Sequence, residues 1–392
     1  MKLAHLADLH LGFRQFDRQT PRGGNQREAD VAEVFRRAVD DLLAQKPDLV
    51  LVAGDVFHSV RPTNAAILFL WQQLQRIRVA LPETAVVLIA GNHDTPRSAE
   101  TGTILRLYEA LGVEIVVDKP RRIHFPKLDC AVLAVPSQAL NAPERPALRP
   151  EPGATRNVLL IHGLIEEVLG PDESAAEYWG ATLTRAEIAP AQWDYVALGD
   201  YHVAHEVAAN AWYPGSLEHI NPRAWVQLRE EAKRKLPGKG YLLVDLPGAK
   251  VTFRHVPTTR RMLDLPPVQG AGLTAKEIDQ QIAERVARAK PPIDDQVIRL
   301  VAYGVSRATA RDLDHAVIRS YKARALNFHL DVRRPESTYE AGIGSPGRRQ
   351  TLPETVKEYL GRRLLDADVD RGEFVRLGVA YVEDAGREEQ PA

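Results

Sequence analysis

Residues that can bind a metal or move a proton follow several short apolar runs in this sequence. The clearest case is the run at 85–90, after which Gly91, Asn92, His93 and Asp94 follow at once. The same order recurs at residues 3–7 before Asp8 and His10, 49–53 before Asp55, 158–161 before His162, and 195–198 before Asp200 and His202. Runs of this length and composition are typical of buried strands, and ligands bind where the strands of an α/β sheet end. The repetition predicts strands of one sheet that bring these side chains to one rim.

The donor types indicate a metal centre. Carboxylate and amide oxygens mixed with imidazoles suit two divalent ions, with Mn²⁺ favoured and Fe²⁺ or Mg²⁺ as alternatives, better than a thiolate-rich zinc site. Two ions about 3.5–4 Å apart would clamp a phosphate oxygen and activate a water for in-line displacement.

One histidine of the set needs a different role. Asn92 and His93 are adjacent, and a turn does not easily aim both side chains at one ion. We therefore predict that His93 donates a proton to the leaving oxygen or stabilises transition-state charge, and that Asp94 holds its ring and tautomer. His58, three residues after Asp55, is a further candidate for the active site. Taken alone, Asp55 and Asp200 would be interpreted as ordinary turn aspartates.

Composition narrows the class of protein. The chain has 392 residues, 44% hydrophobic and 26% charged, with a formal net charge of -1. This is typical of a soluble globular protein and gives no overall signal for nucleic acid or membrane, so contact with a polyanion requires local basic clusters or metal. The single cysteine, Cys130, excludes an intrachain disulfide, and no run reaches the roughly 20 apolar residues of a membrane span. We expect a cytoplasmic protein without membrane contact.

The pattern of helices and strands predicts three parts. Residues 1–258 contain the motifs, helices at 26–45 and 62–78, and a hairpin at 241–253. Residues 259–340 alternate helix and strand as a small α+β domain, whose arginines and lysines from Arg307 onward suggest contact with a nucleic-acid backbone. Residues 341–392 combine a Gly/Pro/Arg linker over 342–350 with two amphipathic segments at 353–365 and 371–382 that would bind a partner.

Two surface features leave alternatives open. The helix at 62–78 is apolar around its circumference, which predicts either burial under another part of the chain or a homodimer contact that includes the helix at 103–111. Arginines 14, 18, 22 and 27 follow the first motif, and they are either solvated loop charges or phosphate contacts beside the metal rim.

The motif set resembles the calcineurin-like metallophosphoesterase superfamily, and within it the SbcD-type DNA double-strand-break repair nucleases. The matching pattern is Asp8-x-His10, Gly54-Asp55, Gly91-Asn92-His93-Asp94, His162 and Gly199-Asp200-x-His202, in the family's order. The resemblance covers roughly residues 1–260 well. It implies a four-layer αββα sandwich with a small α+β cap.

The resemblance also implies roles for single residues. One metal would be held by Asp8, His10, Asp55 and His202, and the second by Asp55, Asn92, His162 and Asp200, so that Asp55 bridges them. His93 would be the catalytic histidine, and His58 would help to place the nucleic-acid strand. Position 200 departs from the family pattern, which has histidine there. A carboxylate is still a competent ligand, and we expect it to change the metal preference.

The leading hypothesis is a Mn²⁺-dependent DNA nuclease, an exonuclease or endonuclease, that docks through its terminal segments on an SMC-like coiled-coil ATPase. A second hypothesis keeps the fold and assigns a small phosphoester or cyclic nucleotide as substrate. A third, motivated by Asp200, is a catalytically weak scaffold subunit of such an ATPase complex.

Overall fold

The computed structural model describes residues 1–96, 102–169, 180–220, 224–335, 352–363 and 370–388. The chain divides into two compact units, residues 1–335 and 336–392. The linker predicted over 342–350 lies outside the described residues. Among the residues that are described, no helix is long and apolar enough to cross a membrane.

The first sheet of unit 1 is mixed and contains the N-terminal strand, β1, among its inner strands. Its strand order is β14-β13-β1-β2-β3-β4. The neighbouring strands β1, β2, β3 and β4 are parallel, whereas β13 runs antiparallel to β1 and forms the predicted hairpin with β14. The bounds are β1 Lys2–Leu6, β2 Leu49–Ala53, β3 Ala85–Ile89, β4 Glu114–Val116, β13 Gly240–Asp245 and β14 Lys250–His255.

The second sheet has the order β11-β12-β10-β7-β6-β5. Its inner strands are parallel and both edge strands are antiparallel to their neighbours. The bounds are β5 Arg121–Phe125, β6 Cys130–Val135, β7 Arg156–His162, β10 Tyr195–Gly199, β11 His205–Ala208 and β12 Ala211–Tyr213. The motif-bearing strands therefore belong to two sheets, and the prediction of a single sheet is wrong.

Apolar side chains fix how the two sheets pack. Along β2, Leu49, Leu51 and Ala53 point into the core between the sheets, where they meet Leu160 of β7 and Ala197 of β10. Alternate residues of the same strand, with Val50 among them, point outward to the helices. This period of two, with both faces buried, explains why the strands have nearly continuous apolar sequences.

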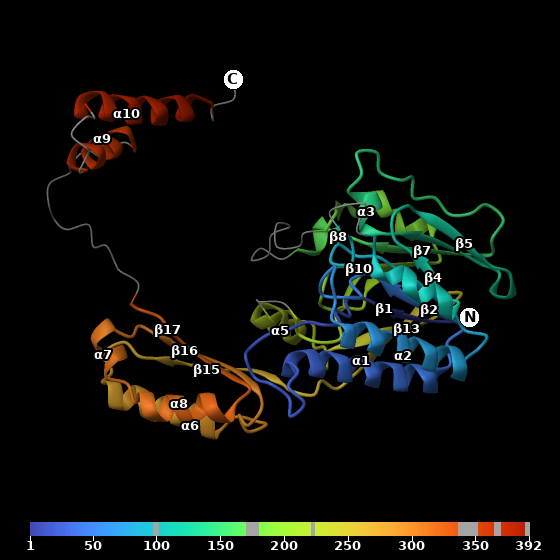
Figure 1. Cartoon of the computed structure of the whole chain (residues 1–392), viewed down its shortest axis with the longest axis horizontal. Coiled ribbons are helices and arrows are strands. Elements are labelled where there is room, and N and C mark those ends of the chain that lie inside the picture. The colour runs from blue at the N-terminus through green and yellow to red at the C-terminus, as the bar shows by residue number, and fades with distance from the viewer. Residues whose placement is uncertain (97–101, 170–179, 221–223, 336–351, 364–369, 389–392) are drawn as a thin grey trace. The chain divides into compact units, whose positions relative to one another are not determined.

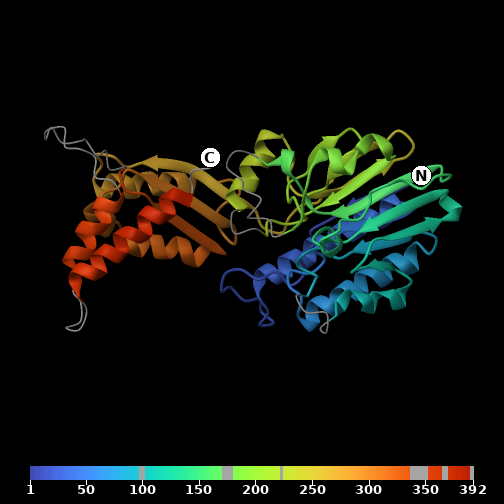
Figure 2. The same ribbon diagram turned by 90° about the horizontal axis from the view of Figure 1, so that it is seen from above.

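Helices cover the outer faces of this sandwich (Figures 1 and 2). The first sheet is covered by α1 (Gln26–Gln45), which matches its predicted range, and by α2 (Asn64–Ala80). The second is covered by short elements, among them α3 (Ser137–Leu140) and α4 (Arg185–Ile188), with the small strands β8 (Leu164–Ile165) and β9 (Thr182–Leu183) beside them. The predicted metallophosphoesterase-type α/β sandwich is confirmed.

The apolar helix α2 is only partly covered by its own chain. The 3₁₀ helix Ile104–Leu111 packs against it, and Tyr108 donates a hydrogen bond to the carbonyl of Ile67 at 3.0 Å. Leu68 and Val79 stay 62% and 76% exposed. Burial within the chain thus accounts for part of the apolar circumference, and the homodimer contact stays a prediction.

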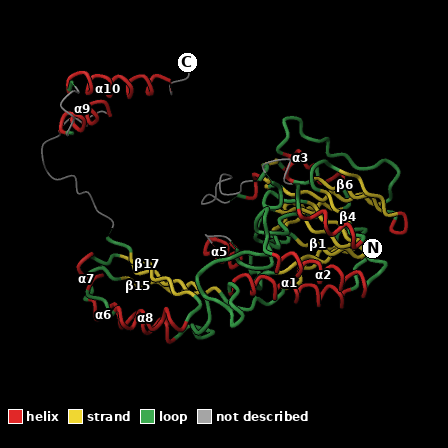
Figure 3. The backbone as a smooth tube through the Cα atoms, in the orientation of Figure 1, coloured by secondary structure: helices red, strands yellow, loops and turns green. Residues whose placement is uncertain are grey.

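A small separate core follows the β13–β14 hairpin of the first sheet. The parallel sheet β15 (Met262–Gln269), β16 (Val297–Tyr303) and β17 (Asn327–Val332) is covered by α6 (Ala275–Ala287), α7 (Arg307–Arg311) and α8 (His315–Arg324) (Figure 3). The sequence did not predict β15, whose two prolines argue against a strand. The predicted boundary between residues 258 and 259 stays a prediction.

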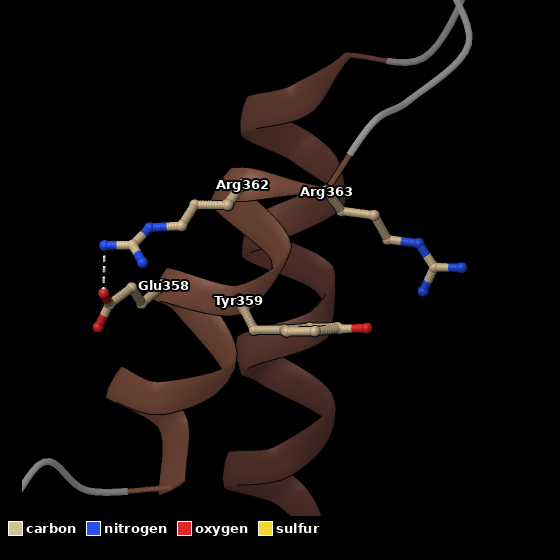
Figure 4. Close-up of a pocket in the computed structure, with 4 residues that line it drawn as sticks. All are labelled: Glu358, Tyr359, Arg362 and Arg363. Carbon is tan, nitrogen blue, oxygen red and sulfur yellow. Dashed lines mark ion pairs between the residues drawn. The ribbon is translucent and has the colours of Figure 1, made fainter.

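In unit 2 two helices pack on each other. They are α9 (Leu352–Arg362) and α10 (Arg371–Glu388), close to the predicted amphipathic segments. A Cβ at Gly378 of α10 would collide with the Leu360 side chain of α9, and the Arg371 guanidinium donates to the carbonyl of Gly361 at 2.7 Å. Figure 4 shows Glu358 and Arg362 of α9 joined as an ion pair at 2.5 Å, with Tyr359 and Arg363 turned to the other side.

Close contact between the two sheets gives a test of the fold. A Cβ on Gly199 at the end of β10 would collide with the backbone carbonyl of Ala53 at the end of β2. Since neither backbone can yield without moving a sheet, we expect Gly199→Ala to lower the free energy of unfolding by about 1–3 kcal/mol. Urea denaturation measures this.

The matched control is Gly24→Ala. At Gly24 the nearest atom to an added Cβ is the Thr20 Oγ1, 3.7 Å away, and the backbone is not in the left-handed region. We expect this variant to stay within about 0.5 kcal/mol of the wild type. Equal stabilities of the two variants would contradict the assigned sheet contact.

Candidate metal centre

Five strand ends from the two sheets meet at one place. Asp8 and His10 follow β1, Asp55 follows β2 and Asn92 follows β3, whereas His162 ends β7 and Asp200 and His202 follow β10. Backbone hydrogen bonds extend the pairing of the first two strands beyond their ends, from the Asp8 amide to the Gly54 carbonyl (3.0 Å) and from the His10 amide to the Asp55 carbonyl (2.9 Å). The rim predicted from the sequence exists, but both sheets build it.

The backbone is unusual where these side chains emerge. Asp8, His10, Asp55 and Asp200 have φ angles of 52°, 44°, 49° and 104°. Positive φ is uncommon for residues with a side chain and persists where the surrounding structure imposes it, often at functional sites. The local conformation therefore turns each of these side chains away from the strand direction.

Glycine is required beside two of these residues for steric reasons. A Cβ on Gly91 would collide with the carboxylate and the amide of Asp55, and a Cβ on Gly54 would collide with the imidazole of His162. The Gly-Asp and Gly-Asn pairs of the sequence are thus explained by the close approach of the motif loops, which leaves no room for a side chain at Gly54 or Gly91.

One group of ligand atoms gathers around His10. Single ligand atoms of Asp8, His10 and His202 lie within 4.8 Å of one another. The His10 Nε2 is 3.3 Å from Asp55 Oδ2, whereas its Nδ1 hydrogen-bonds to the Nδ1 of His58 at 3.2 Å. His10 therefore directs Nε2 toward the carboxylates.

A second group gathers around His162. Its Nδ1 lies 2.7 Å from the carbonyl of Ala53, and because a carbonyl only accepts, the proton belongs on Nδ1 and Nε2 has a free lone pair. That Nε2 is 2.9 Å from Asn92 Oδ1, 3.6 Å from Asp55 Oδ1 and 3.7 Å from Asp200 Oδ1. Asp55 thus turns one oxygen to His10 and the other to His162.

The electrostatics of the cluster suit divalent cations. Burial raises the pKa of Asp55 and of Asp200 to about 6, and burial together with the charges of Asp55 and Asp200 raises the pKa of Asp8. Burial also lowers the pKa of His10 and His202, so these imidazoles are neutral and able to bind metal. Asp200 Oδ2 and His10 Nε2 are buried without a hydrogen-bond partner among the described residues. The donor set therefore fits two divalent ions.

His93 and His58 lie beside the first group. The His93 ring centroid is 4.8 Å from that of His10 and 5.3 Å from that of His58, on which it stacks. The Nδ1 of His93 hydrogen-bonds to the carbonyl of His58 at 2.8 Å, and its backbone amide donates to Asp55 Oδ1 at 2.9 Å. The structure places both histidines next to the metal ligands.

The role predicted for Asp94 is wrong. Its carboxylate accepts hydrogen bonds from the backbone amides of Val56 (3.0 Å), Phe57 (2.9 Å) and Gly91 (3.0 Å) instead of holding the His93 ring. The ring is held by the carbonyl of His58. Asp94 joins the loops after β2 and β3. The sequence does not reveal this role, because residue types do not show which backbone amides a side chain contacts.

One further expectation changes in the structure. Arg27 is 1% exposed and pairs with Glu218 at 3.3 Å and Asp30 at 3.4 Å, so it is no phosphate contact. A helix that the motifs do not point to, α5, spans Ala224–Lys233. From it Gln227 reaches His202, with 3.2 Å between Gln227 Nε2 and His202 Nδ1, a contact that no motif in the sequence announced.

Comparison with known proteins places this geometry in a family. The family model for the calcineurin-like phosphoesterases matches residues 1–204. The chain is 25% identical over 354 residues to the DNA double-strand break repair protein Mre11 of Methanosarcina mazei, covering 80% of this chain and 54% of that protein. It is 23% identical over 411 residues to the protein of the same name from Methanopyrus kandleri, covering 100% of this chain and 84% of that protein.

A shorter match has higher identity. Over 97 residues the chain is 34% identical to the Mre11 protein of Methanocaldococcus jannaschii, covering 25% of this chain and 24% of that protein. The chain spans about half the length of the two Methanosarcina relatives, at 54% and 56%.

Metal uptake should depend on pH. Mn²⁺ must displace the protons that Asp55 and Asp200 hold below their pKa of about 6, so affinity should fall by up to about tenfold per pH unit and proton as the pH drops below 6. The raised pKa of Asp8 adds to this dependence. At Mn²⁺ about 100-fold above its Kd the free energy of unfolding should rise by about 2.7 kcal/mol. Thermal unfolding of metal-stripped protein with and without Mn²⁺ at pH 5 to 8 measures both effects.

Asp55→Asn should abolish most of this stabilisation because it removes the carboxylate shared by the two groups. Asp245→Asn is the control. Asp245 is exposed and lies opposite Lys2 in the β1–β13 ladder, at the end of β1 far from the ligands. Stabilisation by Mn²⁺ that is equal in both variants would exclude Asp55 as a ligand.

Proposed function

The chain belongs to the calcineurin-like phosphoesterase family, and on this premise we propose that it is a metal-dependent DNA nuclease of repair or recombination. The observation that carries the proposal is that the two carboxylate oxygens of Asp55 face His10 (3.3 Å) and His162 (3.6 Å), with His93 beside them. The name shared by the relatives, DNA double-strand break repair protein, supports DNA as the substrate.

We assign Asp8, His10, Asp55 and His202 to one divalent ion, and Asp55, Asn92, His162 and Asp200 to the second. Mn²⁺ is the expected metal, with Fe²⁺ and Mg²⁺ as alternatives. When bound, two such ions supply charge stabilisation for a phosphodiester and a nucleophile at neutral pH. The distances around His162 and the raised pKa values of Asp55 and Asp200 support this assignment.

His93 is the proposed acid. Its Nδ1 donates to the His58 carbonyl, which directs the other nitrogen, Nε2, away from that carbonyl. When Nε2 is also protonated, it can donate to the leaving oxygen of the scissile phosphodiester. The bond between the His93 amide and Asp55 Oδ1 ties the position of the ring to the carboxylate that both groups share. His58 positions His93 and helps to place the strand.

The cap over residues 259–340 is the proposed DNA-contact domain. Arg18, in the loop after the first motif, donates to the carbonyls of Ala323 (2.8 Å) and Ala325 (3.0 Å) at the end of α8, so the loop joins the cap to the motif region. Arg307, Arg311 and Arg319 are exposed on α7 and α8, or partly so, and a phosphate backbone needs such contacts. Arg348 and Arg349 lie outside the described residues.

Residues 341–392 are the proposed partner-binding part. Tyr359, Leu377 and Tyr381 are exposed on the packed pair α9 and α10, which leaves apolar surface for an SMC-like coiled-coil ATPase. The exposed Leu68 and Val79 of α2 support a homodimer through the helix at 62–78. Repair of chromosomal DNA would place the protein in the cytoplasm.

Cleavage of end-labelled DNA tests the proposal. Linear duplex and single-stranded DNA are incubated with wild type and Mn²⁺, Mg²⁺ or a chelator. We expect Mn²⁺-dependent cleavage that Asp55→Ala abolishes, because the variant loses the shared ligand. We expect His93→Ala to lower the rate by about 10²–10⁴-fold with Mn²⁺ still bound, because the variant removes only the proton donor.

His124→Ala is the control, because His124 is exposed on β5 of the second sheet. We expect this variant to cleave DNA like wild type. Cleavage by His93→Ala at the wild-type rate would refute its role. Two bound metals with cleavage only of small phosphodiesters would support the second hypothesis. Fewer than two metals and no cleavage would identify Asp200 as the residue that weakens the second site and would favour a scaffold.

A further inference from the structure

The buried face of α5 is polar, which is unusual for a helix packed on a domain. Its buried residues are Ala224, Gln227 and Glu231, and the last two are only 3% and 5% exposed. Buried polar side chains are costly unless they have hydrogen-bond partners. Gln227 Nε2 lies 3.2 Å from Nδ1 of His202, so the polar face is directed at a proposed metal ligand.

The buried side chain of Lys239 supports the same histidine from behind. Its ammonium donates to the His202 carbonyl (2.8 Å) and the Ser216 hydroxyl (3.2 Å), and it forms an ion pair with Glu231 (2.9 Å). It also lies 3.5 Å from Oε1 of Gln227. Lys239 is 3% exposed, so this charge is placed in the interior to hold its neighbours.

The backbone of His202 is fixed as firmly as its ring. Its carbonyl accepts hydrogen bonds from the Ser216 amide (3.1 Å) and the Ser216 hydroxyl (3.3 Å) in addition to the ammonium of Lys239. His202 follows the end of β10 in a loop, where no strand pairing would otherwise hold it. The network therefore replaces the sheet as the element that positions this ligand.

We propose that Gln227 is the positioning residue that makes His202 a metal ligand. The inference rests on the proposed function, in which His202 binds the first ion. An imidazole binds a cation through one nitrogen only when the proton is on the other nitrogen. With its Nε2 toward Nδ1, Gln227 donates to Nδ1 and the ring proton is on Nε2. When the carboxamide turns, Oε1 accepts from a protonated Nδ1, which fixes the ring and leaves Nε2 available to a cation.

The carboxamide suits this task because it serves both tautomers of His202. It donates through Nε2 or, after turning about its last bond, accepts through Oε1. The metal-binding tautomer carries its proton on Nδ1 and requires an acceptor there. A carboxylate at position 227 provides that acceptor and forms an ion pair with Lys239, whereas an apolar side chain of similar length provides neither.

The test compares Gln227→Glu and Gln227→Met in the full-length chain. Titration of metal-stripped protein with Mn²⁺ should show that Gln227→Met weakens binding at one of the two sites by about 10–100-fold, because His202 loses the partner that orients it. Gln227→Glu should bind Mn²⁺ at least as tightly as wild type. The control is Gln280→Met on the exposed surface of α6, which should bind like wild type.

A purely structural role gives the opposite order. Without a link to the metal, Gln227→Glu would be the more harmful change, because it buries an additional carboxylate, and Mn²⁺ affinity would not change in either folded variant. Equal Mn²⁺ affinity of Gln227→Met and wild type would therefore overturn the inference. Nitrogen NMR of the His202 ring gives a second readout, since its Nδ1 signal should change in Gln227→Met.

The two proposals fail in different ways. If wild-type protein binds no Mn²⁺, the metal centre of the proposed function is refuted, and this inference with it. If wild type binds two ions and Gln227→Met binds them equally well, only this inference is refuted. DNA cleavage does not enter either comparison.

Discussion

Three buried carboxylates, Asp8, Asp55 and Asp200, are brought together where the two sheets meet, and much of the molecule depends on holding them there. Burial alone raises their pKa, and for Asp8 and Asp200 the neighbouring carboxylates raise it further. Such crowding is unfavourable in the folded chain without a cation. The arrangement therefore favours the binding of positive charge, and divalent ions can supply that charge.

The surrounding backbone and packing hold the three carboxylates in this unfavourable arrangement. Left-handed backbone at Asp8, Asp55 and Asp200 aims the carboxylates, and Gly54 and Gly91 remove the Cβ atoms that would collide with His162 and Asp55. Asp94 uses its carboxylate on three backbone amides to join two of the motif loops. These constraints come from the backbone and the packing of the chain itself, as a preorganised site requires.

The sequence predicts where these side chains emerge because its signals are local. An apolar run of strand length followed by Gly-Asp or Gly-Asn fixes both the strand and the side chain at its end, and this holds for β2, β3 and β10. It cannot assign strands to sheets, since pairing is a long-range choice. Five strand ends thus suggested one sheet, whereas β7 and β10 belong to the second.

Sequence reasoning misassigned two buried residues of the motif region, Asp94 and Arg27. The adjacency of Asp94 and His93 predicts a contact between their side chains, yet Asp94 accepts hydrogen bonds from backbone amides up to 38 positions away. Arg27 followed a loop of solvated arginines, but the exposed loop ends before it, and α1 turns it inward to Glu218. In each case the partner is a backbone group or a side chain distant in the sequence. The spacing of residue types does not predict such a partner.

Asp200 shows how the charge constraint connects these parts. A histidine at this position would be neutral, whereas Asp200 adds a third carboxylate to a site that already holds Asp8 and Asp55. Its amide donates to both oxygens of Asp8 at 3.2 Å, and the positive charge of Lys239 also lowers the pKa of Asp8. These contacts stabilise the ionised form of Asp8 but leave Asp200 Oδ2 without a partner among the described residues. An ion with a preference for hard oxygen ligands would satisfy that oxygen best, and on this ground we expect Asp200 to make the second group more selective for such ions.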